Sequence, residues 1–132
     1  MVIQRWQSLL LFISALVIGA GLVFPIGSIV CDADSPESST PMYALDILPL
    51  FIVLCLTFVL LLVDIFLYKT LPLQKKVALV CLLLTVVAGV AGGICGSVSV
   101  MVMTSVSAIL TIVAYTRMKA DERLLKSYDR IR

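Results

Sequence analysis

Histidine is absent from this chain of 132 residues, and charged residues make up only 14% of it. Without histidine, the Ser/His/Asp and Cys/His arrangements of many hydrolases cannot form, and the usual zinc and haem ligand sets are missing. The 4 cysteines show no C-x-x-C spacing, so another metal-binding pattern is missing too. We therefore expect no enzymatic activity, no cofactor and no bound metal ion.

The composition excludes a water-soluble domain. Hydrophobic residues make up 61% of the chain, whereas soluble domains typically contain ~45–50%. The remaining polar residues are too few to cover a soluble core, so the excess apolar surface must face lipid. A net charge of +2, carried by short basic clusters, is too small to indicate nucleic-acid binding. The sequence predicts a single integral membrane domain over residues 1–132.

Four apolar segments are long enough to cross a bilayer, whose ~30 Å core needs ~20 helical residues. Residues 77–116 carry no charge, and as one helix they would span ~60 Å. This stretch must therefore fold back, and Gly-Gly-Ile-Cys-Gly-Ser within Gly92–Ser99 is the best place for a turn. The expected spans are residues 8–30, 47–68, 77–94 and 98–116.

Two polar segments accompany these spans: an acidic loop at residues 31–46 and a charged tail at residues 117–132. In the tail, Leu124, Tyr128 and Ile131 recur at helical spacing. The tail is therefore expected to form a short amphipathic helix that extends the fourth span on or near the membrane surface.

The basic residues predict the orientation of the chain. They lie before the first span, between the second and third, and after the fourth, namely at Arg5, at Lys69, Lys75 and Lys76, and six times in residues 117–132. Cytoplasmic flanks of membrane spans are enriched in Lys and Arg. The predicted fold is an all-α, up-down-up-down transmembrane four-helix bundle, with both termini in the cytoplasm and the acidic loop outside.

Asp64 is the one ionisable side chain inside a predicted span. Carboxylates in hydrocarbon are costly and are functional candidates by default. Asp64 lies ~6 Å along the helix from Tyr68 at the expected interface. From this depth it can reach interfacial water, pair with Lys69, Lys75 or Lys76, or bind a proton or cation. The sequence favours the structural alternatives over the ion site.

Small residues predict close helix packing, because they let helices approach each other in lipid. The third span contains two overlapping G-x-x-x-G patterns, and the fourth offers a matching stripe of small and hydroxyl side chains. The predicted packing residues are Gly89, Gly92, Gly93, Gly96, Thr104 and Ala108. A tight hairpin within one subunit is the simplest explanation, with homodimerisation or partner docking as alternatives.

The cysteines divide into two pairs by their predicted depth. Cys55 and Cys81 fall inside spans and are expected to pack there. Cys31 and Cys95 fall at the outer surface, where an oxidising compartment permits a disulfide between them.

Three short segments, one at each end of the chain and one at the end of the second predicted span, resemble those of a known family. These are the first residues from Met1 to Ser8, the Phe66-Leu67-Tyr68-Lys69 segment, and the closing Asp121-Glu122 and Lys126 to Arg132. They resemble domain of unknown function family 4293, small four-span inner-membrane proteins found in Bacteroidetes. The resemblance implies this topology and the bacterial inner membrane, and it supplies no catalytic or binding residues.

Two functions therefore compete. The first is a structural or accessory protein that binds a membrane partner through its charged tail, since the chain has packing faces and no set of reacting groups. The alternative is a small transporter or channel that acts as an oligomer and uses Asp64. The expected partners are the lipid bilayer and either a second membrane protein or further copies of the chain.

Overall fold

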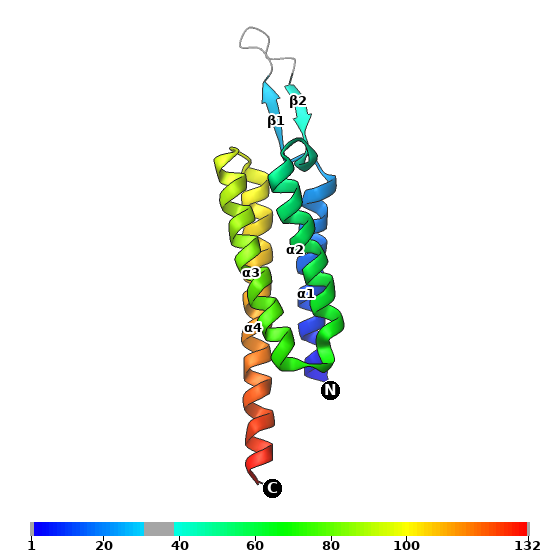
Figure 1. Ribbon diagram of the computed structural model, residues 1–132, viewed down its shortest axis with the longest axis vertical. Helices are drawn as coiled ribbons and strands as arrows, with labels where there is room; N and C mark the ends of the chain where they lie inside the picture. Colours follow the sequence, from blue (N-terminus) through cyan, green and yellow to red (C-terminus); the bar gives the residue numbers. More distant parts are fainter. Residues whose placement is uncertain (1, 31–38, 132) are drawn as a thin grey trace.

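The computed structural model describes residues 2–30 and 39–131 of the chain. Four helices form an elongated antiparallel bundle (Figure 1). Their bounds are α1 (Val2–Val23), α2 (Leu48–Phe66), α3 (Leu71–Ile94) and α4 (Val98–Ile131). Each is long and apolar enough to cross a membrane. The expected all-α architecture with four membrane-spanning helices is confirmed.

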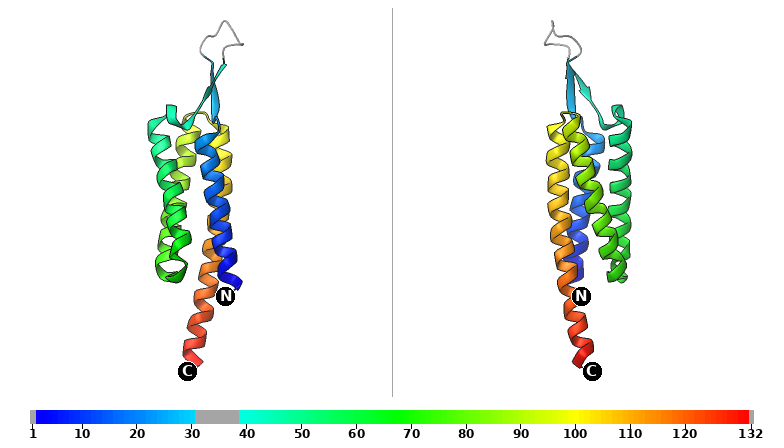
Figure 2. Two further views of the ribbon diagram at one scale, coloured as in Figure 1. Left: turned by 90° about the vertical axis from the view of Figure 1, so that its right-hand side faces the viewer. Right: turned by 60° about the vertical axis from the view of Figure 1, so that its left-hand side comes forward.

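Each helix packs against its neighbours in sequence, and α4 closes the bundle against α1 (Figure 2). We call the end of the bundle toward which both chain termini lie the terminal end (Figure 1). The α2–α3 connection lies at this end too. The opposite end, which carries two strands and the α3–α4 turn, is the hairpin end.

The hairpin end departs from the sequence-based expectation. The first helix ends at Val23 rather than at Val30, because Pro25 has no N–H and disfavours a helical conformation of Phe24. The chain continues into two antiparallel strands, β1 (Gly27–Val30) and β2 (Ser39–Met42). Residues 31–38 of the expected acidic loop, Cys31 among them, lie outside the described residues.

The third helix begins earlier than expected. The third span was predicted to begin at residue 77, but α3 is helical from Leu71 onward, so Lys75 and Lys76 belong to its first turns. Pro72 permits this early start, because proline is favoured in a first helical turn, where its missing N–H has no partner to lose. Pro49 occupies the same position in α2.

The α3–α4 turn lies between Ile94 and Val98, where the glycines interrupt the apolar stretch. Gly96 adopts a φ of +71°, in the left-handed region that favours glycine. Gly92 is needed for another reason, since a Cβ atom there would lie 2.5 Å from Val100 Cγ1. The two helices therefore approach as closely as the small residues of the third span predict.

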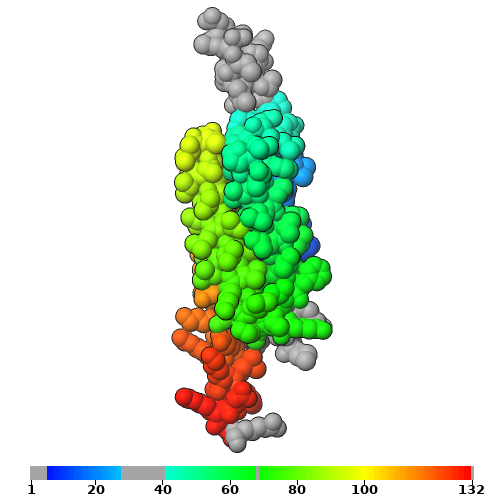
Figure 3. Space-filling model, in the orientation of Figure 1, coloured from blue at the N-terminus to red at the C-terminus, as the bar shows by residue number. Residues whose placement is uncertain are grey.

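The fourth helix continues well past the other three. It has 34 residues, or ~50 Å of helix at ~1.5 Å per residue. Met118 is its last buried residue, and residues 119–131, the α4 extension, project along the bundle axis beyond the packed body (Figures 1 and 3). The extension therefore points away from the bundle, whereas the sequence suggested a helix along the membrane surface.

Candidate functional site

Asp64 faces the interior of the bundle. The buried residues of α2 recur at alternating spacings of four and three, at Leu50, Leu54, Thr57, Leu61 and Asp64. This is the spacing of one helix face, so the carboxyl group continues an otherwise mostly apolar stripe. Its side chain is completely buried, at 0% exposure. The carboxyl group therefore does not reach interfacial water, which was one of the alternatives that the sequence left open for Asp64.

Every other buried polar side chain has a hydrogen-bond partner, whereas neither carboxylate oxygen of Asp64 has one among the described residues. The satisfied side chains are those of Gln7, Ser14, Thr57, Gln74, Thr85, Ser97, Thr104, Ser107 and Thr111. Leaving a buried polar group unsatisfied costs ~1–3 kcal/mol, and more if it is charged. Among the described residues, Asp64 is therefore the one buried polar side chain whose oxygens lack a hydrogen-bond partner.

The first turns of α3 border this carboxyl group. Gln74 is buried, and its Nε2 donates to the backbone oxygen of Asp64 at 3.4 Å. Lys75, one of the three lysines considered as a partner for Asp64, instead pairs with Glu122 on α4. Within residues 2–30 and 39–131, no group of three or more His, Cys, Asp and Glu side chains could hold a metal ion.

A hydroxyl cluster joins α1 to α4 in the interior. Ser14 Oγ lies 2.6 Å from Ser107 Oγ and 3.3 Å from Thr111 Oγ1. Thr111 in turn donates to the backbone oxygen of Ser107 at 2.8 Å. All three side chains are buried, so the cluster aligns α1 with α4 and leaves no free donor for a ligand.

Polar contacts anchor the α4 extension to the terminal end of the bundle. Gln7 Nε2 on α1 donates to Asp121 Oδ2, and Lys75 Nζ on α3 donates to Glu122 Oε2. Glu122 also pairs with Lys126 at 3.1 Å. The hydrogen bond from Lys75, and then that from Lys126, lower the pKa of Glu122 below its usual range. These contacts hold the first turn of the extension.

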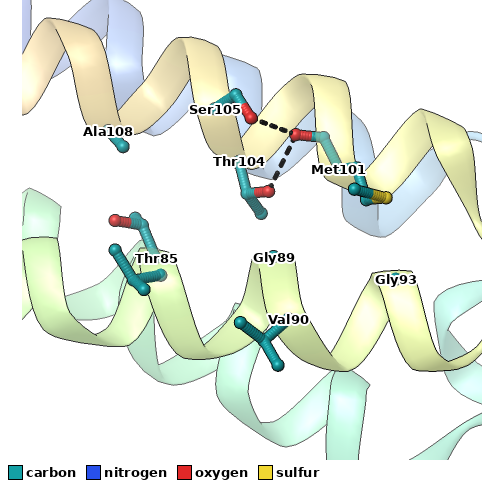
Figure 4. A pocket seen from close by; sticks show the side chains of 9 residues that line it. Thr85, Gly89, Val90, Gly93, Met101, Thr104, Ser105 and Ala108 are labelled. Atoms are coloured by element: carbon teal, nitrogen blue, oxygen red, sulfur yellow. Dashed lines mark hydrogen bonds between the residues drawn. The ribbon is translucent and has the colours of Figure 1, made fainter.

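A groove of about 290 Å³ runs between α3 and α4 on the outside of the bundle (Figure 4). Its lining includes four of the predicted packing residues, Gly89, Gly93, Thr104 and Ala108. A Cβ atom at Gly89 would lie 2.9 Å from Thr104 Oγ1, so the helices are close at the floor of the groove.

The hydroxyl groups of this groove are all occupied within their own helices. Thr104 Oγ1 donates to the backbone oxygens of Val100 and Met101, at 2.7 and 3.1 Å, and Ser105 Oγ donates to that of Met101 at 2.6 Å (Figure 4). Thr85 donates to Leu82 in the same way. The groove therefore offers an apolar surface to lipid.

The two remaining predicted packing residues lie at the turn. Gly92 packs against Val100, and Gly96 makes the reversal itself. Cys95 is exposed in this turn, and Cys81 is buried in α3. Cys31, the partner suggested for Cys95, lies outside the described residues, so the disulfide between them stays a prediction.

The comparison with protein families identifies the chain. The model of the family described as domain of unknown function (DUF4293) matches residues 3–131. The chain belongs to this family. No curated protein and no solved structure matches it.

The match spans the whole four-helix architecture of this DUF4293 chain, including the hairpin end and the α4 extension. Sequence reasoning missed three parts of the site: the inward direction of Asp64, the buried glutamines, and the anchoring of the extension. The spacing of Leu54, Thr57, Leu61 and Asp64 carried a usable signal for the first of these. The anchoring had none, because it depends on contacts between residues far apart in sequence.

Proposed function

We propose that this DUF4293 protein is an accessory membrane protein that binds a second membrane protein through its α4 extension. The observation that carries the proposal is an apolar stripe outside the bundle. Leu124, Tyr128 and Ile131 lie on one face of the extension and are 56%, 78% and 85% exposed. An anchored helix that keeps large apolar side chains in water fits a partner that covers them.

The charges of the extension narrow the chemistry of this partner. Lys119, Arg123, Lys126 and Arg130 follow a second line along the helix at spacings of four, three and four, away from the apolar stripe. All four are exposed. A partner with an apolar groove and an acidic rim would complement both faces, in the way that amphipathic helices are bound elsewhere.

Two neighbouring positions of the extension provide a matched test. The full-length protein is extracted from its native membrane in mild detergent, and its mass and its co-purifying chains are identified by native mass spectrometry. Leu124→Asn should abolish a stoichiometric complex, whereas Arg123→Asn, which places the same side chain on the other face, should retain most of it. Equal retention in both variants, or a wild-type protein without a second chain, would contradict the proposal.

A proposed location follows from the basic residues. Among the described residues, lysine and arginine occur only at the start of α1, in the α2–α3 connection and the first turns of α3, and from Arg117 onward in α4. These segments lie toward the terminal end (Figure 1). By the positive-inside rule, this supports an orientation with the terminal end in the cytoplasm. The resemblance to the DUF4293 family implies the bacterial inner membrane as the location.

The second candidate function is proton transfer through Asp64, by an oligomer of this chain. Its support is the complete burial of a carboxyl group whose oxygens have no hydrogen-bond partner among the described residues. Intramembrane carboxyl groups of this kind mark proton and ion pathways in other proteins. A proton suits this position because it needs no cavity and no further ligands.

Proteoliposomes provide the test of this second function. Under an imposed membrane potential, wild-type protein should acidify the lumen faster than protein-free vesicles, as reported by a trapped pH-sensitive dye. Asp64→Asn should return the rate to that of empty vesicles, and Asp129→Asn, at an exposed position of the extension, should not. Equal proton flux in wild type and Asp64→Asn would exclude this function.

A further inference from the structure

A cleft of about 410 Å³ lies between α1 and α4 near the terminal end. Trp6, Gln7, Leu10, Val113 and Arg117 line it. Its volume falls within the ~300–1,000 Å³ range of small-molecule sites in proteins. It is separate from Asp64 and from the apolar stripe of the α4 extension.

The lining of the cleft changes from polar to apolar along the bundle axis. Trp6 and Arg117 form the polar level. Leu10 follows Trp6 by four residues on α1, and Val113 precedes Arg117 by four on the antiparallel α4, so both apolar residues lie ~6 Å closer to the middle of the bundle. The cleft therefore has a charged mouth and an apolar interior.

The position of the mouth matches a membrane boundary. Arg117 is the first charged residue after the long apolar stretch of α4, and Trp6 directly follows Arg5, the one charged residue of α1. Tryptophan and arginine are typical of the headgroup level, where one part of the side chain is apolar and the other is wet.

The Arg117 guanidinium has no carboxylate partner among the described residues. Trp6 is 65% exposed, and its indole N–H donates to no described residue. Gln7 is different, because its amide N–H already donates to Asp121. The mouth thus presents two unused donors, one of them cationic, which suit a phosphate group.

We propose that this cleft binds one anionic phospholipid from the leaflet at the terminal end. The phosphate accepts hydrogen bonds from Arg117 and Trp6, and an acyl chain lies along Leu10 and Val113. A free phosphate would leave the apolar half of the cleft empty. Basic pockets between membrane helices bind acidic lipid headgroups in other proteins.

Trp6 makes this proposal directly measurable, because it is the only tryptophan of the chain. The full-length protein is reconstituted in two sets of vesicles with the same ratio of phosphatidylcholine to phosphatidylglycerol. In one set the acyl-chain bromines are on phosphatidylglycerol, and in the other an equal amount of phosphatidylcholine carries them. Bromine quenches Trp6 fluorescence only at short range, so the difference reports which lipid occupies the cleft.

The expected result is a clear preference for brominated phosphatidylglycerol, about fivefold over its share of the bilayer if one cation supplies the attraction. Arg117→Gln should remove the preference, and Arg117→Lys should keep most of it. The matched control is Lys119→Gln, which removes the same charge from α4 outside the cleft and should leave the preference intact.

Equal quenching by the two brominated lipids in the wild-type protein would overturn the proposal. An equal loss of preference in Arg117→Gln and Lys119→Gln would overturn it as well, because it would show only a diffuse attraction of acidic lipid to the basic end of the bundle. Circular dichroism of each variant checks that the helices have formed.

Discussion

Lys75 near the start of α3 pairs with Glu122 in the first turn of the α4 extension. The two residues are 47 positions apart in sequence, and the pair exists because α3 begins at Leu71, which places Lys75 on a helix that packs along α4. The pair joins the membrane-spanning bundle to the part of α4 that lies outside it. The direction of the extension is therefore set by the bundle.

We expect the anchoring of the extension to depend on acid pH. Lys75, and then Lys126, lower the pKa of Glu122, so the carboxylate is stabilised in the folded protein relative to an ordinary glutamate, whose pKa is ~4.3. This contribution is complete above the ordinary pKa and is lost as the pH falls through the lowered one. The amide-exchange protection factors of residues 119–131, which are corrected for the slower intrinsic exchange at low pH, should therefore stay high down to mildly acidic pH and fall only below it.

The variant Lys75→Gln gives the control for this pH dependence. It removes the strongest cause of the shift, so the pH at which the protection factors fall should move up toward the ordinary value for glutamate. Asp129→Asn should leave that pH unchanged. An identical pH profile in wild type and Lys75→Gln would show that the pair does not hold the extension.

Gly92→Ala should destabilise the α3–α4 hairpin. The added Cβ would lie 2.5 Å from Val100 Cγ1, which is too close for either helix to accept without moving. Overpacking of this kind costs ~1–3 kcal/mol. The thermal unfolding midpoint in detergent should fall, and the double variant with Val100→Ala should recover much of the loss.

Gly93→Ala is the matched control for the hairpin. Its Cβ would lie 3.4 Å from Met101 Sδ, an ordinary contact with a flexible side chain. Because alanine is a better helix former than glycine by ~1 kcal/mol, this variant should unfold at the same temperature or higher. Equal destabilisation of both variants would indicate that the glycines serve an interface with a second molecule.

Asp64→Leu should stabilise the bundle while abolishing any function of the carboxyl group. The substitution completes the buried stripe of α2 and removes a polar group with no hydrogen-bond partner among the described residues, a change worth ~1–3 kcal/mol. The unfolding midpoint should rise in detergent. A lower midpoint would show instead that Asp64 has a structural role, and that outcome would remove the support for a proton site.

Cysteine labelling should establish the proposed orientation. Cys95 is exposed in the α3–α4 turn at the hairpin end, whereas Cys55 is half-buried in α2 and Cys81 is buried in α3. In a Cys31→Ser variant, a membrane-impermeant maleimide should label Cys95 in intact spheroplasts. In a variant that also lacks Cys95, a new thiol at Ser127→Cys should react only after permeabilisation. The reverse pattern would invert the topology.

Local sequence signals account for much of the fold. Apolar length defines four helices, the glycines after Ala91 mark the last reversal, and both are visible without any tertiary information. The end of the first helix was misjudged because the apolar residues Ile26, Ile29 and Val30 continue past Pro25. Apolar character alone does not separate a helix from a strand, and here proline made the difference.

The sequence by itself determined that the chain has four membrane-spanning helices, because apolar length and charge distribution decide what hydrocarbon accepts. Only the tertiary structure decided which groups meet. It buried Asp64 without a hydrogen-bond partner for its carboxylate among the described residues, directed Lys75 to Glu122 rather than to Asp64, and opened the cleft beside Arg117. These contacts depend on how each helix is rotated and shifted along its axis against its neighbours. Packing between side chains that are far apart in sequence sets this geometry, and no local sequence pattern encodes it.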